Sequence, residues 1–242
     1  MRPKILLLHG SGTNTTIFGF QTYKLASLLR PHFDLVYLEA PIDCGPGPGV
    51  LPFFEGAGPF KKWLHDGDSS NNFVSSSTFE SESNSDSDST KELENLQKQP
   101  EAQEKWDGLD DLINTFFHHA PVAGIIGFSQ GAKATLHLVR WLEAEDILLD
   151  FVLLAGGTAP FKGARVNAYC ERSGKLKTPS VHLVGDLDPW RPESEKLFEY
   201  FEPASREMIR FEGGHNMPMQ KDVNQKVFGL IKELNGKAEG GI

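Results

Sequence analysis

One five-residue segment constrains the fold of this chain more than any other: Gly127-Phe-Ser129-Gln-Gly131. The apolar run before it is typical of a buried strand, and the Ala/Leu-rich stretch after it is typical of a helix. A serine in a strand-to-helix turn, with glycine two residues to either side, is the pattern of a nucleophile elbow. The serine there adopts strained backbone angles, and side chains at the positions of Gly127 and Gly131 would collide with neighbouring backbone. The segment therefore predicts that Ser129 is an exposed nucleophile.

Strand and helix patterns alternate along most of the chain. Short apolar runs predict strands at residues 5–8, 33–38, 123–128, 151–154, 180–184 and 207–211. Helical spacing of apolar residues predicts helices at 17–29, 106–118, 130–145, 193–201 and 221–234. This alternation predicts an α/β fold in one domain, residues 1–242, whose mostly parallel, doubly wound sheet is covered by helices on both faces.

Two segments interrupt the alternation. Residues 41–65 are turn-dense and then apolar, with Val50-Leu-Pro-Phe-Phe54, Phe60 and Trp63. They predict a cap insert that walls an apolar substrate cleft, although packing as a satellite of the core explains the same residues equally well. Residues 66–100 are rich in Ser, Asp and Glu, and such a composition buries too little apolar surface to offset its ordering entropy. We expect a disordered, solvated insert there, with a flexible lid margin or a phosphorylation site as the functional alternatives.

Charge and cysteine content exclude several classes of partner. The formal net charge is −9, and no cluster of Lys and Arg forms a stripe that could follow phosphates, so we expect no nucleic-acid partner. Two cysteines, Cys44 and Cys170, are too few for a disulfide framework and fit a reducing compartment. No apolar run approaches membrane-spanning length, and the first strand is too short for a signal peptide. The composition thus predicts a cytoplasmic protein without a membrane partner.

A nucleophilic serine needs a base, and the base needs an orienting acid. In chains with an elbow of this kind, the acid and then the histidine come later in the sequence than the serine, each in a loop that follows a strand. Gly185-Asp-Leu-Asp188 follows the fifth predicted strand, and Gly213-Gly-His215 follows the sixth. We therefore predict a triad of Ser129, Asp188 and His215. Asp186 lies on the same loop and is the alternative acid; the other seven histidines lie away from the required loop.

The tetrahedral intermediate of acyl transfer needs two hydrogen-bond donors. The backbone N–H of Gln130 directly follows the nucleophile, and the loop His9-Gly-Ser-Gly-Thr-Asn14 offers the N–H of Ser11. His9 itself fits a role in bracing this loop. A phosphate cradle is a weaker interpretation of the same loop, because it has neither a P-loop lysine nor a full G-x-G-x-x-G. No spacing typical of metal ligands occurs, so we expect neither a metal site nor a cofactor.

Together these motifs resemble the FSH family of serine hydrolases, which has the α/β-hydrolase fold. The matching segments are Leu-Leu-Leu-His9-Gly10, Gly127-Phe-Ser129-Gln-Gly131-Ala, Gly185-Asp-Leu-Asp188 and Gly-Gly-His215. The segment between Ala40 and Leu64 is similar to an insert in the fungal branch found with polyketide biosynthesis.

The resemblance implies an esterase or thioesterase that uses the predicted triad. Its substrate would be a hydrophobic acyl ester or thioester, such as a polyketide or fatty acyl chain, with an acyl carrier protein or polyketide synthase as partner. A general carboxylesterase for small hydrophobic esters is the alternative. A non-catalytic ligand-binding protein is less consistent with the sequence, because binding alone does not require Ser, Asp and His in this order.

Overall fold

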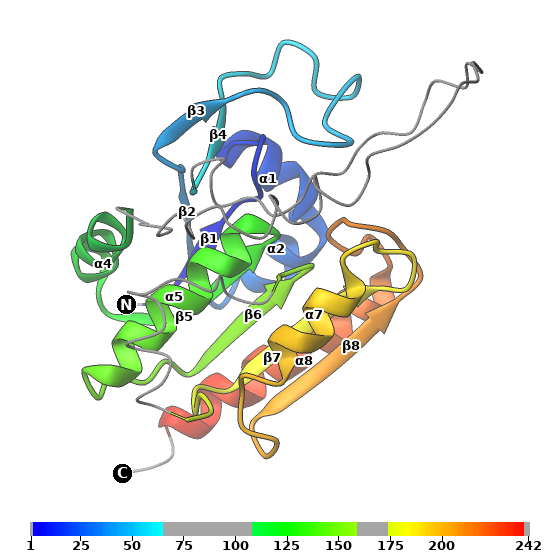
Figure 1. Ribbon diagram of the computed structural model, residues 1–242. Helices are drawn as coiled ribbons and strands as arrows, with labels where there is room; N and C mark the ends of the chain where they lie inside the picture. Colours follow the sequence, from blue (N-terminus) through cyan, green and yellow to red (C-terminus); the bar gives the residue numbers. More distant parts are fainter. Residues whose placement is uncertain (1, 65–107, 159–173, 240–242) are drawn as a thin grey trace, which may run out of the picture.

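The computed structural model describes residues 2–64, 108–158 and 174–239 of the chain. Its main sheet has six strands in the order β2-β1-β5-β6-β7-β8, and every neighbouring pair is parallel (Figure 1). The strands are β1 Lys4–Leu8, β2 Asp34–Leu38, β5 Val122–Phe128, β6 Phe151–Ala155, β7 Ser180–Gly185 and β8 Arg206–Phe211. Each of the six strands that the apolar runs predict is present, within one residue or two at its ends.

Helices cover both faces of this sheet. One face packs against α1 Thr15–Gln21, α2 Tyr23–Leu29 and α8 Lys221–Glu239, and the other against α4 Gly108–His119, α5 Gln130–Ala144 and α7 Arg191–Phe198. Strand β1 shows why its sequence is continuously apolar: Ile5 and Leu7 belong to one core cluster, Leu6 and Leu8 to the other. A strand buried on both faces has no polar side, as expected for the centre of a doubly wound sheet.

The predicted helix at residues 17–29 is two helices in the structure. Asn14 caps the first, its Oδ1 accepting a hydrogen bond from the N–H of Ile17 at 2.9 Å. The helices separate at Thr22, whose hydroxyl donates to the carbonyl of Phe18 at 2.6 Å. Such local side-chain bonds compete with the helical ladder, and apolar spacing does not reveal them. The start of the predicted helix at residue 106 lies outside the described residues.

The insert that follows β2 contains a pair of short strands that the sequence did not predict. Strands β3 Ile42–Cys44 and β4 Phe60–Lys62 are antiparallel and form a separate sheet. Strand β4 also bonds to the loop after β1, because the N–H of Gly12 donates to the Lys61 carbonyl at 2.9 Å and the Lys61 N–H donates to the Thr13 carbonyl at 2.7 Å. The insert is therefore joined to the loop at the carboxyl end of β1. Residues 66–100 lie outside the described part of the chain.

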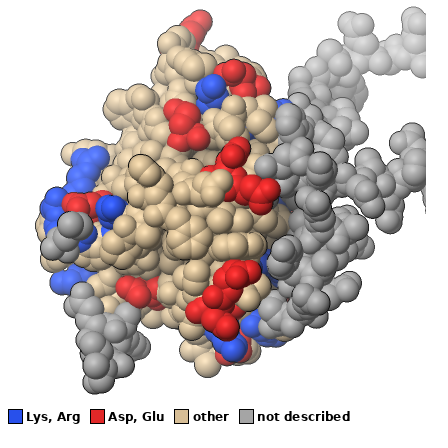
Figure 2. All heavy atoms as spheres, turned by 90° about the vertical axis from the view of Figure 1, so that its left-hand side faces the viewer, with Lys and Arg blue, Asp and Glu red and all other residues tan. Residues whose placement is uncertain are grey.

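Two further observations concern the described helices and the charges on the surface. None of the described helices is long and apolar enough to span a membrane. Acidic side chains occupy several separate places on the face shown in Figure 2, and basic side chains gather mainly at one edge. This distribution agrees with the net negative charge of the chain.

Candidate active site

Ser129 stands at the junction of β5 and α5 with strained backbone angles. Its φ is 53° and its ψ is −118°, a region that L-residues rarely occupy. The turn is held in place because the Ser129 N–H donates to the carbonyl of Ala155 on the neighbouring strand β6 at 2.8 Å. Helix α5 begins at the next residue, so its first N–H groups and the positive end of its dipole lie beside the serine.

The two glycines of the elbow stand where there is no room for a side chain. A Cβ at Gly127 would lie 2.6 Å from the Cα of Ala132 in the first turn of α5. A Cβ at Gly131 would lie 2.5 Å from the carbonyl oxygen of His9 and closer still to that of Leu8. Both positions therefore need glycine because helix α5 packs directly on strands β5 and β1.

The structure brings together Ser129, Asp188 and His215, the three side chains predicted from the order of the loops. The hydroxyl of Ser129 lies 2.8 Å from Nε2 of His215, and Nδ1 of His215 lies 2.9 Å from Oδ2 of Asp188. The other carboxylate oxygen of Asp188 accepts the backbone N–H of Trp190 at 2.8 Å. The Asp188 side chain is 1% exposed, so its charge faces the imidazole rather than water. If Nδ1 carries the ring proton, as its carboxylate partner requires, Nε2 accepts the hydroxyl proton of Ser129.

The alternative acid, Asp186, points elsewhere. Its Oδ1 forms an ion pair with Arg210 of β8, 2.6 Å from Nη2, and its side chain is 44% exposed. Strands β7 and β8 are paired so that Gly185 lies opposite Phe211, and this register places Arg210 beside the start of the loop. The arginine thus holds Asp186 on the outer side while Asp188 turns towards His215.

Aromatic rings and a glycine hold the imidazole of His215 in position. The ring centroid of Trp190 lies 4.5 Å from that of His215, and the centroid of Phe128 lies 5.1 Å from it. A Cβ at Gly156, where φ is +53°, would lie 2.9 Å from Cε1 of His215. Sequence reasoning identified neither Trp190 nor Gly156 as part of the site. Trp190 directly follows Asp188 and Pro189 in the predicted acid loop, and this adjacency was a signal that it could have used.

A cavity of about 500 Å³ lies against the serine. Its lining includes Ser129, His215 and both residues predicted to supply oxyanion donors, Ser11 and Gln130. Leu64, from the end of the insert, is one of the buried apolar side chains in its wall, and Val50 is another. Trp63 and Leu64 both belong to the core cluster, but Trp63 does not line the cavity, so the insert contributes to both the cavity wall and the core.

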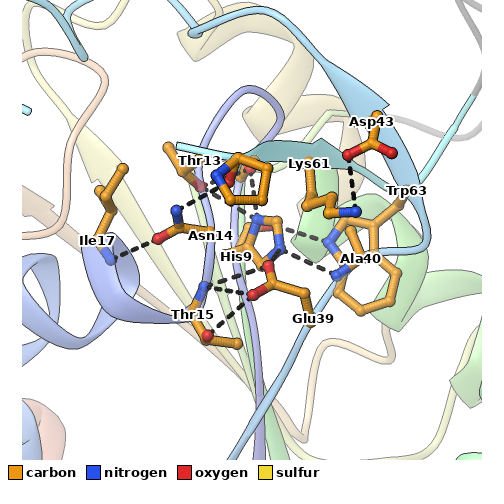
Figure 3. Close-up of polar contacts among 12 residues, drawn as sticks. His9, Thr13, Asn14, Thr15, Ile17, Glu39, Ala40, Asp43, Lys61 and Trp63 are labelled. Atoms are coloured by element: carbon orange, nitrogen blue, oxygen red, sulfur yellow. Dashed lines mark hydrogen bonds and ion pairs between the residues drawn. The ribbon is translucent and has the colours of Figure 1, made fainter. Parts of the chain in front are cut away.

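His9 is fully buried beneath the loop that holds Ser11 (Figure 3). Its Nδ1 lies 2.8 Å from the carbonyl oxygen of Gly10, and its Nε2 lies 3.1 Å from the backbone nitrogen of Ala40. Nε2 also lies 3.0 Å from Oε1 of Glu39, so it faces a carboxylate acceptor as well as a backbone N–H. Burial lowers the pKa of His9, and the carbonyl of Gly10 and the charge of Glu39 oppose this shift. His9 thus connects the loop after β1 with the end of β2, as its predicted bracing role requires.

The side chain of Gln130 has a position that the sequence did not suggest. Its Oε1 accepts two backbone N–H groups of the insert, from Trp63 at 2.7 Å and from Leu64 at 3.3 Å. The indole Nε1–H of Trp63 donates to the carbonyl of His9 at 2.8 Å.

Among the described residues there is no group of three His, Cys, Asp or Glu side chains that could hold a metal ion.

Comparisons with known proteins agree with this geometry. A family model for serine hydrolases (FSH1) matches residues 1–227. Esterase FUS5 of Gibberella fujikuroi is 35% identical over 233 residues, which cover 95% of this chain and 86% of the esterase. Thioesterase FSL2 of Gibberella zeae is 29% identical over 246 residues, which cover 93% of this chain and 89% of the thioesterase.

Among solved structures, SOBER1 of Arabidopsis thaliana aligns with a TM-score of 0.57 at 17% identity, over 97% of this chain and 99% of that one. At this identity the similarity concerns the fold alone. The family match, the sheet order and the elbow together confirm the predicted α/β-hydrolase fold.

Proposed function

The chain belongs to the serine hydrolase (FSH1) family, and on this premise we propose that Ser129, His215 and Asp188 carry out the hydrolysis of an acyl ester or thioester. The observation that supports this most strongly is the unbroken series of hydrogen bonds from the Ser129 hydroxyl through His215 to the buried Asp188. It lies at the wall of a cavity large enough for a small-molecule acyl group.

In the first half of the reaction, the Ser129 oxygen attacks the substrate carbonyl carbon while Nε2 of His215 takes the hydroxyl proton. The carbonyl π bond opens, and its electron pair moves onto the oxygen. Asp188 stabilises the resulting imidazolium and keeps its Nδ1–H in the right direction. As the intermediate collapses, the bond to the alcohol or thiol breaks, and His215 returns the proton to this leaving group.

The negative oxygen of the intermediate is held by the backbone N–H groups of Ser11 and Gln130 in our proposal. Both residues line the cavity beside Ser129, and Gln130 is the first residue of α5, so the helix dipole also favours the charge. In the second half, His215 removes a proton from a water molecule that attacks the acyl–Ser129 carbonyl. The acid leaves, and the Ser129 hydroxyl is restored.

We further propose that the acyl group is a polyketide or fatty acyl chain carried as a thioester in secondary metabolism. Support comes from the resemblance of residues 41–65 to the insert of the fungal polyketide branch, and from the relatives called esterase and thioesterase. Residues 41–65 would act as the cap, with Val50 and Leu64 as apolar walls. An acyl carrier protein or polyketide synthase in the cytoplasm is the partner that this substrate implies.

Two measurements test the proposal. Ser129→Ala should abolish turnover of acyl esters and thioesters while leaving the thermal unfolding temperature close to that of the wild type, and a fluorophosphonate probe should label the wild type but not this variant. Undiminished hydrolysis by Ser129→Ala would refute it. Turnover of matched acyl-thioester and oxoester analogues then separates the thioesterase from a general carboxylesterase, which would prefer the oxoester.

A further inference from the structure

Trp63 connects the two sides of the proposed oxyanion site without belonging to the cavity wall. Its backbone N–H donates to Oε1 of Gln130 at 2.7 Å, and its indole N–H donates to the carbonyl of His9 at 2.8 Å. Trp63 is 4% exposed, and its ring lies 5.6 Å from that of His9 between centroids. One buried residue thus joins the first residue of α5, through its backbone N–H, to His9, directly after β1, through its indole N–H.

These two attachment points flank the two proposed donors. Gln130 supplies one N–H from its own backbone while its side chain holds Trp63. His9 lies two residues before Ser11, which supplies the other N–H, and the next residue, Gly12, donates its N–H to Lys61 of β4 at 2.9 Å. The loop around Ser11 is therefore tied to the insert on both sides, and the insert is tied to α5 only one residue after the nucleophile.

We propose that Trp63 and the Gln130 side chain form a positioning clamp that sets the separation of the Ser11 and Gln130 N–H groups. The inference rests on the proposed function, since it assigns a task to the insert within the same acyl transfer. Oxyanion stabilisation depends on donors aimed at the place where charge develops, so an error of a fraction of an ångström in one donor lowers the rate. Trp63 does not line the cavity, and its bonds to Gln130 and His9 lead directly to these donors.

The chain offers variants that cut the clamp at either end. Trp63→Phe keeps the backbone N–H and most of the buried ring but removes the indole donor to His9. Gln130→Met keeps the length of the side chain and the backbone N–H but removes the acceptor for the backbone N–H groups of Trp63 and Leu64. Trp141→Phe is the matched control, because Trp141 lies in α5 with its ring against Phe117, 6.1 Å between centroids, and outside the cavity lining.

Complete loss of one oxyanion donor typically costs roughly 100-fold to 1,000-fold in kcat, and a misplaced donor should cost less, about 10-fold. We expect each clamp variant to lower kcat about 10-fold with KM changed less than about 2-fold. Affinity for a trifluoromethyl ketone, which forms a tetrahedral adduct with the serine, should fall by the same factor as kcat. The double variant should be little worse than either single one, since both cut the same clamp. Trp141→Phe should match the wild type in all three measurements.

The outcome separates positioning from simple packing. If the variants lower only the unfolding temperature, and kcat and ketone affinity below that temperature equal those of the wild type, the clamp is refuted. Multiplicative losses of about 100-fold in the double variant would also refute a single clamp. If Trp63→Phe does not fold, Gln130→Met alone decides, by the same comparison. Failure of the proposed function would look different, because the wild type itself would then resist fluorophosphonate labelling and hydrolyse no ester.

Discussion

Replacing Gly131 by alanine tests whether the close packing of α5 on β1 maintains the site. Gly131 lies in the first turn of α5, where alanine normally stabilises a helix by about 1 kcal/mol relative to glycine. Here the added methyl group would meet the carbonyl oxygen of His9 at 2.5 Å and that of Leu8 closer still. Since such contacts below 3.0 Å essentially never occur, the backbone must move by at least about 0.5 Å.

Overpacking of this kind typically costs about 1–3 kcal/mol, which exceeds the gain in helix propensity. The atom pushed away, the carbonyl oxygen of His9, is also the acceptor of the Trp63 indole N–H. We therefore expect Gly131→Ala to lose, net of the gain in helix propensity, up to about 2 kcal/mol of unfolding free energy and also to lower kcat. Gly229→Ala is the matched control: Gly229 is an exposed glycine of α8, and a Cβ there would meet nothing within 4 Å. It should gain up to about 1 kcal/mol and leave kcat unchanged.

Urea unfolding followed by circular dichroism gives both free energies, and initial rates with a chromogenic acyl ester give kcat. The decisive quantity is the difference between the two variants, because the helix-propensity effect is common to both. We expect Gly131→Ala to be less stable than Gly229→Ala by the overpacking cost alone, about 1–3 kcal/mol. Equal stabilities, or an unchanged kcat for Gly131→Ala, would show that the contact between α5 and the end of β1 relaxes easily and does not support the site.

Three further predictions follow from individual side chains. Asp188→Asn should lower kcat roughly 1,000-fold to 10,000-fold, whereas Asp186→Asn, which removes only a half-exposed ion pair, should change kcat less than about 2-fold in the same assay. Ser129→Gly should be more stable to urea than Ser129→Ala by about 1 kcal/mol, because glycine adopts a φ of 53° without strain; equal stabilities would contradict strain at the elbow. Burial and the charge of Arg206 lower the pKa of His182 to about 3, so the unfolded chain binds a proton that the folded chain excludes. Stability should therefore fall as the pH drops below about 6.5, by roughly 2 kcal/mol at pH 5 from this group, and the urea midpoint of His182→Gln should depend less on pH than that of the wild type.

The sheet could be predicted from sequence because its strands are buried on both faces. A run such as Ile5 to Leu8 needs no knowledge of its neighbours to be recognised, since any parallel central strand must be apolar throughout. The elbow was equally accessible, because its glycines and serine follow one another in sequence and their spacing alone describes the turn. The break at Thr22 was not accessible, since the hydroxyl bond that accompanies it leaves the apolar spacing intact.

The choice between the two aspartates shows where sequence reasoning reaches its limit. Asp186 and Asp188 share one loop, and the sequence favours Asp188 only because its spacing from Gly185 leaves the loop room to turn inward before Pro189. In the structure, the pairing of β7 with β8 places Nη2 of Arg210 2.6 Å from Oδ1 of Asp186, and this ion pair keeps Asp186 away from His215. The chain order of acid and base could be predicted. The ion pair between Arg210 and Asp186 could not, because it depends on the register of β7 and β8, which the sequence alone does not define.

The same limit explains why the insert was open to two interpretations. The apolar residues of 41–65 indicate burial, and burial alone does not distinguish a cavity wall from core packing. In the structure Leu64 does both, since it lines the cavity and belongs to the core cluster, whereas Trp63 is buried against His9 and does not line the cavity. The two hydrogen bonds of Trp63, to the carbonyl of His9 and to Oε1 of Gln130, join residues that are 54 and 67 positions apart in the sequence. Because Leu64 lines the cavity and Trp63 contacts the backbone beside the proposed donors, changes at these two neighbours should affect substrate fit and transition-state stabilisation to different degrees. Substitutions of Leu64 should mainly change KM, and those of Trp63 mainly kcat.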